Sequence, residues 1–112
     1  MDTGERGKLV AFVDAYVVSF EAWDILMYFA AHPDGRVDAT DLARDIGRRV
    51  EELAAAAQEL ERLGVLAGAE ASGWRLVDTP EIRGGLRLFA EAVKDQKDRL
   101  FVLTRLLENL SR

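Results

Sequence analysis

The sequence has no cysteine, two prolines and a single histidine among its 112 residues. Without cysteine, the chain can form neither a disulfide framework nor a thiolate zinc site, and it has no cysteine nucleophile. His32 stands alone beside Pro33, whereas a catalytic or metal site needs several converging groups. The sequence therefore predicts a protein that is not an enzyme and that holds neither a metal nor a cofactor.

Long apolar runs and the pattern of a signal peptide are also missing. Asp14, Glu21 and Asp24 interrupt the apolar N-terminal stretch, so no window approaches the roughly 18 to 20 uncharged residues of a membrane span. The first ten residues are acidic before they are apolar and contain no small-residue cleavage site. We therefore expect a cytoplasmic protein without a membrane partner, whose 49% apolar residues build one core.

Basic side chains are outnumbered, with 15 Lys and Arg against 20 Asp and Glu and a net charge of −5. This charge opposes non-specific binding to nucleic acid, because that binding is driven by the neutralisation of phosphates. The charge is uneven, at −4 over residues 1–40 and +2 over residues 81–112. An acidic N-terminal part with a mildly basic C-terminal part is compatible with DNA binding but does not indicate it.

Apolar residues recur at helical spacing from residue 6 to residue 31, and Ser19 can begin a new helix at Phe20. We expect an N-terminal helix over residues 6–18 and a second one that ends before Pro33. The positions on the shared apolar face are Leu9, Val13, Tyr16, Phe20, Trp23, Met27 and Ala30.

Two short helices follow between residues 38 and 64. Asp38 resembles an N-cap, and Gly47 and Gly64 are placed to end the first and second helix. Two short helices that meet at a glycine make a candidate helix-turn-helix.

Residues 65–68 and 74–77 have the pattern of two strands around a turn at residues 70–73. Trp74 is expected to face the helices, which directs its neighbour Arg75 away from the core. Thr79 and Pro80 then begin a helix that we predict to run over residues 80–110, with a hinge at Gly84 and Gly85.

These motifs resemble those of bacterial winged-helix regulators, and the MarR and PadR families are the nearest. The resemblance rests on residues 41–47, on Leu53, Ala57 and Leu60, and on residues 61–66, and it covers roughly residues 20–78. It implies a mainly α fold with a small β-hairpin: one winged-helix domain over residues 1–112, flanked by the N-terminal helix and a long C-terminal helix. The pattern departs from these families at Arg48 and Arg49, where an apolar and a capping residue are usual.

The resemblance to winged-helix regulators implies that this chain is a dimeric transcriptional regulator that binds double-stranded DNA. The side chains opposite the apolar stripe of the second helix, together with the turn and the second strand, are the candidate DNA contacts. These candidates are Arg48, Arg49, Gln58, Arg62 and Arg75. Glu51, Glu52 and Glu59 lie among them and repel phosphate, so a protein-binding adaptor that does not bind DNA is the alternative.

The last helix carries apolar positions at alternating spacings of three and four, interrupted by one glutamine. Such a heptad seam commonly pairs helices, so it predicts a homodimer, although pairing within one chain is equally consistent with the pattern. The predicted dimerisation residues are Leu86, Phe89, Val93, Gln96, Leu100, Leu103, Leu107 and Leu110.

Overall fold

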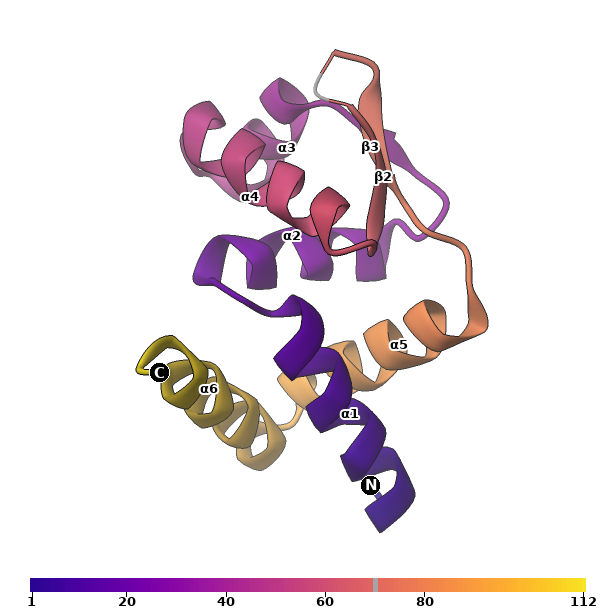
Figure 1. Ribbon diagram of the computed structural model, residues 1–112, viewed down its shortest axis with the longest axis vertical. Coiled ribbons are helices and arrows are strands. Elements are labelled where there is room, and N and C mark those ends of the chain that lie inside the picture. The colour runs from indigo at the N-terminus through magenta and orange to yellow at the C-terminus, as the bar shows by residue number, and fades with distance from the viewer. Residues whose placement is uncertain (70) are drawn as a thin grey trace. The chain divides into compact units, whose positions relative to one another are not determined.

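The computed structural model describes residues 1–69 and 71–112, which form two compact units. Unit 1 comprises Met1–Ser19 and Asp78–Arg112, and unit 2 comprises Phe20–Val77. The chain is mainly helical and contains a small antiparallel sheet (Figure 1). The predicted mainly α class is confirmed at this level, while the predicted hairpin is joined by a third strand.

Two helices of unit 2 are joined by a short turn. α3 (Ala39–Ile46) begins at Asp38, whose Oδ1 accepts a hydrogen bond of 2.8 Å from a backbone N–H in the first turn. α3 ends at Gly47, which has a φ of 83° and therefore adopts the left-handed conformation that glycine tolerates best. α4 (Val50–Arg62) starts three residues later. The predicted cap and the predicted glycine turn are both confirmed.

The sheet of unit 2 has the strand order β1-β3-β2, with both pairs antiparallel. Its strands are β1 (Arg36–Val37), β2 (Leu66–Ala69) and β3 (Gly73–Leu76). Trp74 on β3 is fully buried and Arg75 is exposed, as the alternation of side chains along a strand requires. The prediction that Trp74 faces inward is confirmed.

Close approach of the two hairpin strands depends on glycine. Gly68 has a φ of 123°, and a Cβ there would overlap the carbonyl oxygen of Gly73 on the neighbouring strand. The expected turn at residues 70–73 includes Glu70, which lies outside the described residues. Also in unit 2, α2 (Phe20–Ala31) contacts α3 and α4 and buries four apolar side chains, namely Ala22, Ile25, Leu26 and Phe29.

Unit 1 is built from three helices, α1 (Thr3–Tyr16), α5 (Pro80–Lys94) and α6 (Gln96–Leu110), each of which contacts the other two. α1 begins and ends earlier than the predicted range of residues 6–18. α5 begins as predicted: the Thr79 hydroxyl accepts a hydrogen bond of 3.2 Å from the backbone N–H of Ile82.

The predicted continuous helix over residues 80–110 is divided into two. Asp95 ends α5 and caps α6, since its carboxylate accepts a hydrogen bond of 2.9 Å from the backbone N–H of Asp98. The predicted hinge at Gly84 and Gly85 was also wrong, because both lie inside α5. Gly85 is needed for packing instead: a Cβ there would lie 2.5 Å from the ring of Phe12 on α1.

Candidate functional site

Arg48, in the turn between α3 and α4, is bound to α2. Its Nε donates a hydrogen bond of 2.6 Å to Asp24, and its Nη1 lies 3.6 Å from a carboxylate oxygen of Glu21. The hydrogen bond to Asp24 raises the pKa of Arg48 further above its usual range. Arg48 therefore connects the turn to α2, and it would have to leave two carboxylates in order to contact a phosphate.

The outer face of α4 is the side directed away from the buried residues Leu53, Ala57 and Leu60. In a helix-turn-helix that binds DNA, this side of the second helix enters the major groove. The outer face carries three carboxylates and one guanidinium. It is formed by Glu51, Glu52, Ala55, Gln58, Glu59 and Arg62.

The guanidinium of Arg62 is bound to a carboxylate on the same face. It donates two hydrogen bonds to Glu59, of 2.9 Å and 2.5 Å, in a side-by-side arrangement. The pKa of Glu59 is lowered by this hydrogen bonding, and the pKa of Arg62 is raised by it. Because the only cation of the outer face is neutralised locally, Glu51 and Glu52 determine the charge that a partner meets there.

Two further predicted DNA contacts remain accessible. The side chain of Arg49 is 77% exposed, and its Nε approaches Glu51 no closer than 3.8 Å. Arg75 lies on β3, where its backbone pairs with β1 and β2 while its side chain is exposed. Gln58 is exposed at the middle of the outer face.

Sequence reasoning missed the role of Arg36 on β1. Its guanidinium donates hydrogen bonds of 3.1 Å to the Gly73 carbonyl and 3.4 Å to the Ser72 carbonyl. Arg36 also stands opposite Arg75 in the strand register, so it ties β1 to the hairpin beside that exposed cation. No local pattern could reveal this contact, because the two strands are almost forty residues apart in the chain.

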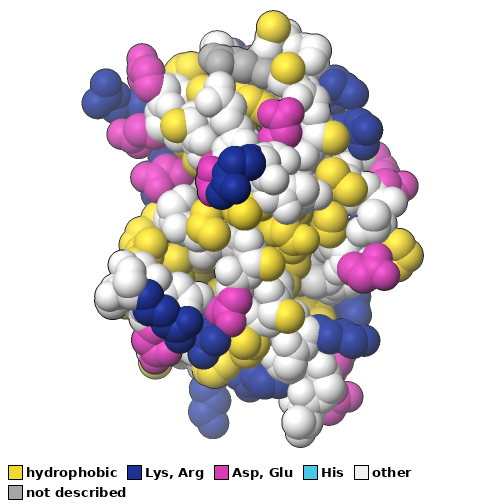
Figure 2. Space-filling view, viewed as in Figure 1, with side chains coloured by type: hydrophobic (Ala, Val, Ile, Leu, Met, Phe, Trp, Pro, Cys, Tyr) yellow, Lys and Arg dark blue, Asp and Glu magenta, His cyan; other side chains and the backbone are white. Residues whose placement is uncertain are grey.

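The net charge of the protein lies entirely in unit 2. This unit contains 11 acidic and six basic side chains, a net charge of −5, whereas unit 1 contains nine of each. Figure 2 shows a face of the molecule on which acidic and basic side chains are interspersed. The unit that holds the α3–α4 pair is therefore the acidic one.

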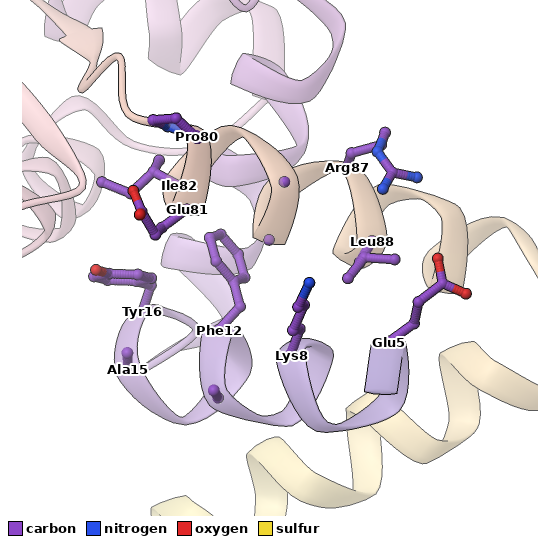
Figure 3. Close-up of a pocket in the computed structure, with 13 residues that line it drawn as sticks. Glu5, Lys8, Phe12, Ala15, Tyr16, Pro80, Glu81, Ile82, Arg87 and Leu88 are labelled. Carbon is purple, nitrogen blue, oxygen red and sulfur yellow. The ribbon is translucent and has the colours of Figure 1, made fainter. Parts of the chain in front are cut away.

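A groove of about 640 Å³ lies between α1 and α5 in unit 1 (Figure 3). Lys8 and Phe12 rise from α1 toward α5, with Tyr16 at one end of the groove and Glu5 and Arg87 at the other. Its lining contains two acids and two bases, the fourth charged residue being Glu81. These balanced charges favour no particular class of ligand.

The predicted dimerisation seam is divided between buried and exposed positions. Leu86 and Phe89 are buried inside unit 1, so neither is available to a second chain. Val93 is half-buried near the end of α5, and Gln96 is exposed at the start of α6. The remaining four leucines all lie on α6, and three of them are among the most exposed apolar side chains of the described residues: Leu100, Leu107 and Leu110.

Within the described residues, no group of three or more His, Asp or Glu side chains could hold a metal ion. Nor does the same part of the chain contain a helix of the length and apolar character that crossing a membrane requires.

Comparison with protein-family models, characterised proteins and solved structures finds no significant match. Function must therefore be inferred from the residues of the chain itself.

Proposed function

We propose that the chain is a winged-helix interaction module that binds a protein partner through the outer face of α4. The α3–α4 pair and the three-stranded sheet support the winged-helix interpretation, because they occur in the order that this fold requires. The observation that carries the binding proposal is the charge of the outer face, where three glutamates stand against one arginine that is already bound to Glu59.

The charge of unit 2 favours a basic partner. A net charge of −5 attracts a positively charged surface over a distance of about 8–10 Å at physiological salt. The small side chain of Ala55 lies at the centre of the outer face, and beside it Glu51 and Glu52 can each meet a Lys or Arg of the partner. Glu59 can do so when the partner's cation replaces Arg62.

A DNA-binding homodimeric regulator is the second candidate, and the exposure of Arg49 and Arg75 favours it. Exposed ion pairs contribute little free energy, so the contact of Arg49 with Glu51 would yield readily to a phosphate. Arg75 is exposed on a wing strand, where it could contact the DNA backbone. The glutamates of α4 would then face the major groove, and their repulsion of phosphates makes this candidate the weaker one.

The proposal is tested by cross-linking from the outer face. A photoreactive phenylalanine derivative in place of Ala55 should capture a defined protein in cells of the native host, because Ala55 is exposed at the centre of that face. The matched control carries the same derivative at Gly7 on α1, which is exposed with no atom within 4 Å of an added Cβ.

The adduct should disappear when Glu51, Glu52 and Glu59 are all replaced by Gln, with the circular dichroism of the protein unchanged. Adducts with DNA from position 55 would establish the second candidate instead. The same protein captured equally from positions 55 and 7 would contradict the assignment of the outer face.

A further inference from the structure

An apolar stripe lies exposed along α6 and has no role in the proposed protein binding. The leucine stripe consists of Leu100, Leu103, Leu107 and Leu110. Three of its members are exposed to 62%, 48% and 50%, in the order Leu100, Leu107 and Leu110, and Leu103 is partly exposed. Four leucines in one row on the surface are unusual for a helix that stays unpaired, because burying each of them would be favourable.

Contacts on the other side of α6 hold the leucine stripe outward. Val102 and Leu106 face the interior of unit 1 and are fully buried. Asp98 accepts a hydrogen bond of 3.1 Å from Arg6, and Arg105 donates two hydrogen bonds of 2.8 Å and 2.7 Å to Asp14. Rotation of α6 to bury the stripe would break these contacts with α1, so the stripe can be covered only from outside unit 1.

The spacing of the leucine stripe makes it complementary to itself. The intervals of three, four and three residues read identically in both directions, so two copies related by a two-fold axis can match when their helices run antiparallel. We propose that α6 pairs with α6 of a second copy of this chain, with Leu100 opposite Leu110 and Leu103 opposite Leu107. This inference is independent of the proposed partner of unit 2.

The charges beside the stripe select the antiparallel orientation. In that orientation the flank carrying Lys97 and Glu108 meets the same flank of the second copy, which brings the Lys97 of each copy toward Glu108 of the other. A parallel pair would instead set Lys97 beside Arg99, and these like charges repel. Antiparallel helices also place opposite ends of their dipoles together.

The size of the stripe sets the expected strength of the dimer. From Leu100 to Leu110 it extends along about 15 Å of helix. A standard interface buries about 800 Å² on each partner, and a single row of four leucines provides less than this. We therefore expect a weak dimer, seen as a rise in average mass as the protein concentration approaches about 1 mM.

Sedimentation equilibrium of the full chain tests the proposal. The wild-type protein should show a reversible monomer–dimer equilibrium, and Leu107→Glu should raise its Kd about tenfold or more, because a carboxylate would enter an apolar contact. Val50→Glu is the matched control, since Val50 is an exposed apolar residue of unit 2 and lies outside the stripe. It should leave the Kd unchanged.

Disulfide cross-linking tests the orientation, and the absence of native cysteine makes each introduced thiol unique. When Leu100→Cys and Leu110→Cys variants are mixed and oxidised, the disulfide between the two variants should exceed either disulfide between identical chains. Residues 100 of two antiparallel copies lie about 15 Å apart along the helix axes, beyond the reach of a disulfide.

Three results would overturn the proposal. A wild-type chain that stays monomeric to about 1 mM would show that the stripe does not pair. A dimer that is unaffected by both Leu107→Glu and Leu100→Glu would place the interface elsewhere. Preferred cross-linking of Leu100→Cys to itself would show a parallel pair.

Thermal unfolding of the Leu107→Glu and Leu100→Glu variants should match that of the wild type, because both leucines project into solvent in the single chain.

Discussion

The two units of this chain differ most in how their charges and apolar surfaces are distributed. Unit 2 carries the whole net charge of −5 and presents glutamates on α4, whereas unit 1 is electrically balanced and presents the leucine stripe on α6. Charged surfaces govern the rate and specificity of association, and apolar surfaces supply most of its free energy. Under the two proposals above, unit 2 would select the partner and unit 1 would bring two copies together.

The basic residues of the two units also have different roles. In unit 2, Arg48 and Arg36 connect elements that are distant in sequence, to α2 and to the hairpin respectively. In unit 1, Arg6 and Arg105 fasten α6 to α1. Of the four arginines predicted from the sequence to contact DNA, Arg48 and Arg62 are engaged with carboxylates of the same chain, and Arg49 and Arg75 remain accessible.

The largest predicted effect falls on the hairpin of unit 2. Gly68→Ala should lower the free energy of unfolding by about 3 kcal/mol, because a side chain at a φ of 123° is strained and would overlap the Gly73 carbonyl. Urea denaturation followed by circular dichroism measures the change. Gly7→Ala serves as the control and should not destabilise, since nothing lies within 4 Å of its added Cβ.

Adjacent glycines in unit 1 should respond with opposite signs. Gly85→Ala should lower the free energy of unfolding by about 1–3 kcal/mol, because Phe12 is buried and cannot move aside freely. Gly84→Ala should raise it by about 0.5–1 kcal/mol, since alanine favours a helix interior and nothing obstructs its Cβ. Equal effects of the two substitutions would contradict the packing of α1 on α5.

Two arginines of unit 2 should differ in how much they contribute to the free energy of unfolding. Arg48→Ala should lower the free energy of unfolding by about 1 kcal/mol, because Asp24 and Glu21 lose their shared partner in a half-buried position. Arg62→Ala should produce no measurable change in the denaturation midpoint, because its contact with Glu59 is exposed to solvent. If Arg62→Ala were the more damaging of the two, the role assigned to Arg48 would be wrong.

The last predicted effect is the pH dependence of unit 1. The hydrogen bond from Arg105 lowers the pKa of Asp14 from 3.8 to about 2 in the folded chain. A lowered pKa stabilises the fold above pH 3.8, and this contribution is lost as the pH falls toward 2. Since the Asp14 side chain is partly exposed, its contribution should be only about 1 kcal/mol.

Asp14→Asn provides the measurement. Compared with the wild type, it should be less stable in urea at pH 7, and the difference should shrink as the pH falls from about 4 to about 2. A difference that stays constant over this range would show that the carboxylate charge is not what stabilises the contact.

Local patterns in the sequence predicted much of unit 2. The Asp38 cap, the glycine at the end of α3 and the inward Trp74 each follow from the conformation of a few neighbouring residues. The ion pair between Arg48 and Asp24 could not be predicted in this way, because it depends on how α2 lies against the turn. The pairing of β1 with β3 depends on tertiary structure for the same reason.

In unit 1 the periodicity of the sequence led to a wrong prediction. A run of alternating three- and four-residue spacings predicts one helix. The same spacing can continue unchanged, however, when one helix ends and the next begins at a single residue. Asp95 followed by Asp98 is a pattern typical of a helix start, but the heptad interpretation gave it no weight. As a result, Leu86 and Phe89 were assigned to a dimer seam although they belong to the core of unit 1.

The role proposed for the outer face of α4 is best tested by fluorescence anisotropy of a short, random-sequence DNA duplex, titrated with the protein at low salt. We predict no saturable binding by the wild type, and binding by a variant in which Glu51, Glu52 and Glu59 are all Gln, which changes the charge of the outer face from −2 to +1. Glu81, Glu91 and Glu108, replaced together, provide a control of equal charge in unit 1. Saturable, salt-sensitive binding by the wild type that is lost in Arg49→Ala/Arg75→Ala would overturn the proposed protein binding and establish the DNA-binding candidate.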